Sequence, residues 1–171
     1  MSERTGAVTM RGNPLTLIGP ELKVGEKAPD FKVVGNDLKP VTLGDTIGKV
    51  RILSSVPSLD TPVCDMETRR FNDEAGKLPG LEVLTVSMDL PFAQKRWCGA
   101  AGISNVRTLS DYQDRSFGSA YGVLIKELLL DARAVFVLDK DNTLRYVEYV
   151  KEVAEHPNYD AIIGAAKKLL A

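Results

Sequence analysis

Apolar residues along the chain follow two different periods, one near two residues and one near 3.6 residues. Near the N-terminus, two short apolar stretches flank a Gly-Asn-Pro turn, which predicts a β-hairpin over residues 7–18. Further apolar runs bounded by turn residues predict strands at Phe31–Val34, Val50–Val56, Leu81–Met88, Val106–Leu109, Ala134–Leu138 and Leu144–Tyr149. One of them, Leu81–Met88, is apolar on both faces, as expected in a sheet that is covered on both sides.

Three longer segments have helical spacing. Apolar residues gather on one side of a helix predicted over Thr61–Leu78 and of a second one over Pro157–Leu170. A proline that suits a first helical turn opens a third predicted helix, Pro91–Cys98. Strands that alternate with helices, followed by a closing hairpin and helix, indicate an α/β fold with a mixed β-sheet.

Length and composition describe an ordinary globular chain. Its 171 residues predict a single domain spanning 1–171, long enough to bury a core without disulfide or metal staples. Lys and Arg total 22 and Asp and Glu total 23, giving a net charge of −1. This balance argues against a nucleic-acid or anionic-membrane surface, because such surfaces usually carry a basic excess.

No apolar run approaches the roughly 20 residues that a membrane-spanning helix needs. The most apolar stretch, Tyr121–Leu138, contains four charged residues, and the N-terminus has no hydrophobic signal core. We therefore expect a cytoplasmic protein. Two cysteines are too few for a disulfide scaffold, so in a reducing compartment they are buried thiols, metal ligands or redox centres.

Cys64 directly follows a predicted buried strand and lies in the first turn of the predicted helix. The partial positive charge of a helix N-terminus stabilises a thiolate at such a position. Thr61 lies three residues earlier, on nearly the same helix face, and could donate to the thiolate or to an oxygen bound beside it. Pro57 and Pro62 stiffen the approach. The plain alternative is a small buried thiol at a helix start.

Cys98 lies on a different predicted helix, 34 residues after the first cysteine. Two thiols on separate helices need not lie within the distance of about 7 Å between Cα atoms that a disulfide requires. A bond between them would then require local unwinding around either cysteine. Taken alone, Cys98 also fits a packed, unreactive thiol.

Other chemistry has weaker support. The sequence lacks Cys-x-x-Cys spacing and Gly-rich phosphate loops, and its single histidine, His156, precedes a proline as a helix-start or surface residue would. Arg133 begins an apolar strand, where a cation needs an anionic partner. That partner is either an acid such as Asp131 or a thiolate across the sheet.

Pro57-x-x-x-Thr61-x-x-Cys64 resembles the active-site pattern of the peroxiredoxins. Longer strings are similar to the thiol peroxidase branch, the atypical two-cysteine peroxiredoxins of bacteria, from about Val8 to the C-terminus. These strings are VPSLDTPVCD, TRRFNDEA, SMDLPFAQKRWCGAAGI, ARAVFVLD and EHPNYDAI. Two departures stand out: Trp97 replaces a common phenylalanine and Ala101 a common acidic residue. Both bear on the unwinding of the Cys98 helix and leave the reaction class untouched.

The resemblance implies a thioredoxin-like fold with an N-terminal hairpin and a hydroperoxide-reducing enzyme. It implies Cys64 as the peroxidatic cysteine, Cys98 as the resolving cysteine of an intramolecular disulfide, and Thr61 and Arg133 as activating residues, with Pro57 shielding the pocket. It further implies a homodimer that thioredoxin re-reduces, with no metal, flavin or haem cofactor. Two alternatives remain: a redox sensor that uses the same disulfide to change a partner surface, and a structural α/β domain with slow thiols.

Overall fold

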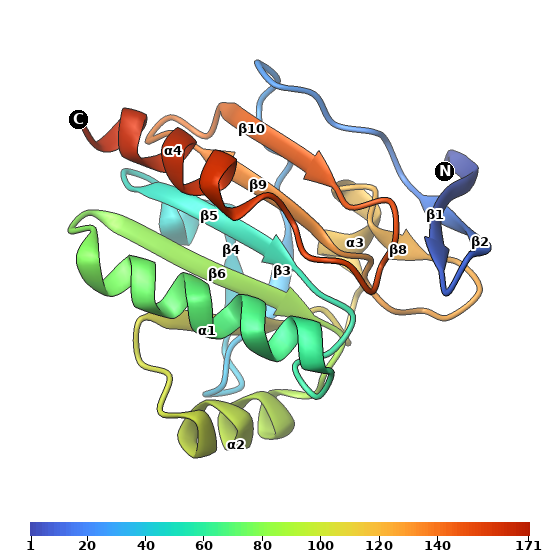
Figure 1. Ribbon diagram of the computed structural model, residues 1–171, viewed down its shortest axis with the longest axis horizontal. Coiled ribbons are helices and arrows are strands. Elements are labelled where there is room, and N and C mark those ends of the chain that lie inside the picture. The colour runs from blue at the N-terminus through green and yellow to red at the C-terminus, as the bar shows by residue number, and fades with distance from the viewer.

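A computed structural model describes all 171 residues, and its centre is a seven-stranded mixed sheet in the order β10-β9-β5-β6-β7-β3-β4 (Figure 1). Three parallel strands, β5 to β7, form its middle, and the flanking strands β9 and β3 run antiparallel to them. The strands of this sheet are β3 (Lys32–Val34), β4 (Pro40–Thr42), β5 (Val50–Ser55), β6 (Leu81–Ser87), β7 (Val106–Ser110), β9 (Ala134–Leu138) and β10 (Leu144–Tyr149).

A separate three-stranded sheet pairs the N-terminal hairpin with a short later strand. Its strands are β1 (Glu3–Met10), β2 (Asn13–Ile18) and β8 (Leu124–Ile125). The helices are η1 (Leu43–Thr46, a 3-10 turn), α1 (Pro62–Lys77), α2 (Pro91–Ala101), α3 (Ser116–Ala120) and α4 (Tyr159–Leu170). None of these helices is long and apolar enough to cross a membrane.

Alternate residues of the central strands pack into two separate cores. On one face, Ile52 and Val137 meet Phe71 of α1 and Ile162 of α4, the two helices that lie in front of the sheet in Figure 1. The opposite face packs against α3, the hairpin and the long loops in a larger apolar cluster. The sheet is thus covered on both sides, as the apolar pattern of β6 predicts.

The predicted α/β fold with a mixed sheet and N-terminal hairpin is confirmed, with differences at the ends of elements. Helix α2 continues past Cys98 to Ala101 and stops at Gly102, whose left-handed backbone (φ 69°) suits glycine. Helix α4 begins at Tyr159 rather than at the predicted proline, because the Asn158 side chain accepts the N–H of Ala161 and caps it.

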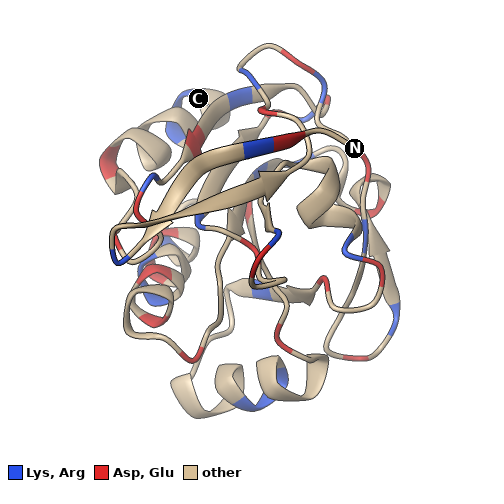
Figure 2. Ribbon diagram, turned by 90° about the vertical axis from the view of Figure 1, so that its right-hand side faces the viewer, with Lys and Arg blue, Asp and Glu red and all other residues tan.

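Four short elements, β4, η1, α3 and β8, have no counterpart in the prediction. Each spans two to five residues. Segments this short are too brief to display a helical or strand period. Figure 2 shows the charged residues of both signs interspersed along the chain, in keeping with the near-zero net charge.

Candidate active site

Cys64 lies where the carboxyl end of central strand β5 turns into α1. Pro62 takes the first helical position and Thr61 is the N-cap, so Cys64 falls in the first turn as predicted. Its side chain is fully buried and packs with Val56 and Leu59, with Trp97 against the same small cluster. The thiol is therefore enclosed by apolar side chains at the positive end of a 16-residue helix.

Arg133 supplies the cation at this pocket. It immediately precedes β9, whose Ala134 pairs with Ser55 at the end of β5. Its Nη2 donates to the Cys64 Sγ at 3.1 Å, while its Nε donates to the Val153 carbonyl at 2.9 Å. Arg133 is itself almost fully buried, so these bonds fix the direction of the guanidinium group.

The acid that balances Arg133 is Glu67, at 2.5 Å from Nη1. Both predicted kinds of partner, an acid and the Cys64 sulfur, contact Arg133, but the acid is not Asp131, whose carboxyl is buried near Asp111. Glu67 lies three residues after Cys64, so one helix face presents both groups to the guanidinium group. Sequence reasoning missed Glu67, although its i+3 spacing from the cysteine is a usable signal.

The charges in this pocket support one another. Burial lowers the pKa of Arg133, but the adjacent Glu67 and Cys64 outweigh burial and hold that pKa above its usual value. Burial raises the pKa of Glu67, while Arg133 and the Ser54 hydroxyl, 2.9 Å away, act in the opposite direction. The guanidinium group therefore contacts two groups at once, the Glu67 carboxyl and the Cys64 sulfur.

Thr61 and Pro57 flank the thiol without contacting it through hydrogen bonds. The Thr61 hydroxyl donates to the Ser58 carbonyl at 2.9 Å and makes no hydrogen bond to Cys64. Donation to the thiolate, which the spacing permits, is thus absent here, and the hydroxyl oxygen keeps its capacity to accept a hydrogen bond. Pro57 is buried between β5 and the loop that follows.

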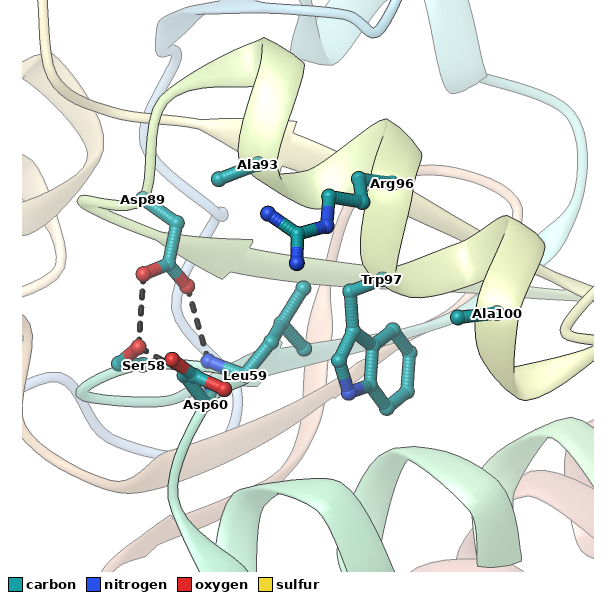
Figure 3. Close-up of a pocket in the computed structure, with 8 residues that line it drawn as sticks. All are labelled: Ser58, Leu59, Asp60, Asp89, Ala93, Arg96, Trp97 and Ala100. Carbon is teal, nitrogen blue, oxygen red and sulfur yellow. Dashed lines mark hydrogen bonds between the residues drawn. The ribbon is translucent and has the colours of Figure 1, made fainter.

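Asp89 anchors that loop, and sequence reasoning missed it. Its carboxylate accepts the Ser58 hydroxyl at 2.7 Å and the Leu59 N–H at 2.8 Å (Figure 3). These bonds fix the residues that precede α1. Beside them a pocket of about 360 Å³ opens between the loop and α2, lined among others by Leu59 and Trp97.

Cys98 occupies different surroundings, in the C-terminal half of α2. It is half-buried, and its sulfur lies 3.5 Å from the Thr108 hydroxyl, which in turn bonds to Asn36. It lines a second pocket with those two residues, whereas its neighbour Trp97 lines the first. Both cysteines are free thiols, Cys64 beside Val56 and Leu59 and Cys98 beside Thr108.

His156 lies apart from both cysteines. It is exposed in the loop before α4, where its Nδ1 is 2.6 Å from the Tyr159 hydroxyl. Its place at the surface is as predicted.

Comparison with known proteins agrees with this geometry. The redoxin family model matches residues 23–163. The chain is 60% identical to the thiol peroxidase of Halalkalibacterium halodurans (96% of this chain, 99% of that one) and 58% identical to that of Bacillus subtilis (95% and 98%). A peroxiredoxin-like protein from Aquifex aeolicus superposes with a TM-score of 0.90 at 47% identity, covering 97% of both chains. The chain therefore has the thioredoxin-like fold and belongs to the redoxin family and, within it, to the thiol peroxidases, the peroxiredoxin-type enzymes that reduce peroxides.

Proposed function

We propose that this enzyme reduces hydrogen peroxide and organic hydroperoxides through Cys64, and that Cys98 and thioredoxin complete the cycle. The observation that carries the proposal is the contact between Arg133 Nη2 and Cys64 Sγ at 3.1 Å. A buried thiol held against a fixed guanidinium group is suited to react as a thiolate.

In the first step the Cys64 thiolate attacks the terminal oxygen of the peroxide. The sulfur–oxygen bond forms as the O–O bond breaks, which leaves a sulfenic acid on Cys64 and an alkoxide or hydroxide that takes up a proton. Arg133 and the N–H groups of Val63 and Cys64 stabilise that developing charge, because the first N–H groups of a helix have no helical acceptor.

Thr61 and Pro57 shape the same step. With its proton engaged by Ser58, the Thr61 hydroxyl is suited to accept a hydrogen bond from the peroxide O–H. Pro57 has no N–H to offer and is buried beside the loop, so we assign it the role of keeping water from the thiolate. Both roles rest on placement and on the family pattern.

In the second step the Cys98 thiol attacks the Cys64 sulfenic sulfur. A disulfide forms and one water molecule leaves. Thioredoxin then supplies two electrons and two protons by thiol–disulfide exchange and returns both cysteines to thiols. Because both electrons pass through sulfur, the cycle needs no metal, flavin or haem.

We also propose that the enzyme is a homodimer in the cytoplasm. Likeness to the thiol peroxidases supports the dimer, and two free thiols with a thioredoxin reductant fit a reducing compartment. Light scattering on the purified protein should give the mass of two chains, and a mass of one chain would contradict the dimer.

The test is to mix the fully reduced enzyme with one equivalent of cumene hydroperoxide in a stopped-flow instrument. Trp97, the only tryptophan, adjoins Cys98 and should report the resolving step. Fast oxidation that ends with the loss of two hydrogen atoms and a linked Cys64–Cys98 peptide supports the cycle. Slow oxidation with a large change in partner affinity would instead favour a redox sensor, and added oxygen without a linkage would rule out the resolving role of Cys98.

A further inference from the structure

Three side chains join the C-terminal half of α2 to the start of α1. The Trp97 indole N–H donates to the Asp65 carboxylate at 3.3 Å. Arg69 pairs with the same carboxylate, and its guanidinium carbon lies 5.8 Å from the centre of the Trp97 ring. Arg69 also donates to the Ala101 carbonyl, the last residue of α2, at 3.4 Å. We call Trp97, Asp65 and Arg69 the α1–α2 latch.

Outside the latch, the second half of α2 has one side-chain hydrogen bond, between the Cys98 sulfur and the Thr108 hydroxyl at 3.5 Å. The buried side chains of the helix, Pro91 and Gln94, both belong to its first half. Gln94 anchors that half through bonds to the Ser87 hydroxyl at 3.0 Å and the Leu109 carbonyl at 2.9 Å. In the second half, Gly99 and Ala100 are exposed, and a pocket separates the helix from the Ser58–Asp60 loop. The latch is therefore the main side-chain attachment of the Cys98 end.

The latch also stands in the path of the resolving step. Trp97 packs against the cluster that buries Cys64, whereas Cys98 points toward Thr108 on another side of α2. For Cys98 to reach the Cys64 sulfur, the C-terminal half of α2 must move away from its present position. The indole ring must then separate from the cluster of Val56, Leu59 and Cys64. Every contact of the latch opposes that motion.

We propose that release of the α1–α2 latch sets the rate at which Cys98 resolves the Cys64 sulfenic acid, which makes Trp97 a positioning residue for that step. This inference rests on the proposed Cys64–Cys98 cycle. A slower release lengthens the life of the sulfenic acid. A second peroxide then has time to oxidise it to a sulfinic acid, transferring one oxygen and leaving as alcohol or water. The latch thus governs the balance between disulfide formation and overoxidation.

The test variant is Trp97→Phe, which keeps an aromatic ring on the Cys64 cluster and removes the indole N–H. After a pulse of peroxide, samples are quenched with acid, alkylated and weighed by mass spectrometry. We expect disulfide formation to become about fivefold faster, the factor for one ordinary hydrogen bond. The peroxide concentration that gives half sulfinic acid should rise by about the same factor. The oxidation rate of Cys64 should stay near the wild-type value.

The matched control is Phe92→Leu, an aromatic replacement on the same helix. Phe92 is 69% exposed and makes no contact with the latch, so its variant should keep wild-type rates. A second latch variant, Arg69→Met, removes the cation over the ring and the bond to Ala101. Arg69→Met should speed disulfide formation by a smaller factor than Trp97→Phe does. It replaces Trp97→Phe as the test variant if Trp97→Phe does not fold.

Amide hydrogen exchange on the reduced enzyme measures how often the C-terminal half of α2 opens, without any catalysis. In Trp97→Phe, amides of residues 98–101 should exchange faster, while those of α4 should not change. A wild-type enzyme that forms no Cys64–Cys98 disulfide would overturn the proposed cycle and the latch together. Normal disulfide formation in the wild type, with unchanged rates and exchange in both latch variants, would overturn the latch alone.

Discussion

The two cysteines occupy regions of opposite character. Cys64 is 0% exposed, lies at the end of a central strand and receives a charged hydrogen bond from an arginine that is itself fixed by two further partners. Cys98 is half-buried near the end of an 11-residue helix, and its one side-chain hydrogen bond is to a neutral hydroxyl at 3.5 Å. In the proposed cycle, the sulfur that needs oriented charge is therefore the one with fixed partners, and the sulfur that would have to move is the one with few contacts.

This contrast has a physical reason. Charge stabilisation is effective when donors are fixed before the reaction, and burial in a covered sheet fixes them. A thiol that must cross to another helix needs a segment with a low local unfolding energy. A helix end with few buried side chains meets that need. The sheet therefore provides the fixed donors for Cys64, and the end of α2 provides the low local unfolding energy for Cys98.

The largest expected effect separates the two cysteines directly. Cys64→Ser should lower peroxide consumption to the uncatalysed level, because serine forms no comparable nucleophile at neutral pH. Cys98→Ser should consume one equivalent of peroxide at the wild-type rate as Cys64 becomes a sulfenic acid. It should consume a second equivalent only where that sulfenic acid is oxidised to a sulfinic acid, and should then stop. Peroxide assays with thioredoxin and intact mass measure both. Sustained thioredoxin-linked turnover by Cys98→Ser would show that the resolving assignment is wrong.

The next largest effect tests what Arg133 contributes to the reactivity of Cys64 and to the stability of the fold. Arg133→Ala should slow the oxidation of Cys64 by about 10²–10³-fold, the usual cost of one preorganised donor. It should also lower the free energy of unfolding by about 3–5 kcal/mol, because Glu67 is left buried without its partner. Stopped-flow kinetics and urea unfolding measure the two quantities.

The double variant Arg133→Ala with Glu67→Gln separates these two losses. Glutamine keeps an acceptor for the Ser54 hydroxyl and carries no charge, so much of the lost stability should return. The slow oxidation should remain. If the rate recovered with the stability, Arg133 would act on the fold alone and would have no direct part in activating Cys64.

Much of this contrast can be predicted from the sequence. The apolar spacing of Thr61–Leu78 places Cys64 in a first helical turn directly after a buried strand, as the structure has it. The partner of Arg133 is a different matter. Sequence proximity favours Asp131, two residues away, but the chain turns that side chain toward α3 and Arg133 toward α1. The pairing depends on which elements meet in space.

The state of Cys98 is predicted only in part. Its place on a separate helix follows from the sequence. A need for movement does not, because the sequence leaves the distance between the two thiols open. The latch does not, because it depends on the C-terminal turn of α2 lying against Asp65 and Arg69 of α1. The sequence alone marks Trp97 as an unusual residue at its position. Its hydrogen-bond partner, Asp65, is known only once the packing of the two helices is known.

The stability of the protein should depend on pH through two buried carboxyl groups, Asp111 and Asp131. Burial raises the pKa of Asp111 to about 6 and raises that of Asp131, which also feels the Asp111 charge. Unfolded aspartates titrate near pH 4, so between about pH 4 and 6 the folded state binds more protons than the unfolded state. Stability therefore falls as pH rises through this range.

Asp131→Asn removes one of these carboxyls and keeps its shape. We expect the free energy of unfolding to increase at pH 8, where the wild-type protein carries the cost of the buried Asp131 carboxyl beside Asp111, and to change little at pH 4. Thermal unfolding across this range measures the slope. Asp73→Asn, on the exposed face of α1, is the control and should follow the wild-type curve. A curve for Asp131→Asn parallel to the wild type would mean that the pair does not titrate as described.

The smallest expected effect concerns the C-terminal half of α2, which carries Cys98. Gly99 follows Cys98 inside α2, and a Cβ added there would meet no atom within 4 Å. Gly99→Ala should therefore stabilise the helix by about 1 kcal/mol. If Cys98 reaches Cys64 by unwinding this turn, disulfide formation should slow by about two- to fivefold, while peroxide oxidises Cys64 at an unchanged rate. Rapid-quench mass spectrometry resolves the two steps. An unchanged rate of disulfide formation would mean that α2 swings outward without unwinding, which leaves the latch to Asp65 and Arg69 as the barrier.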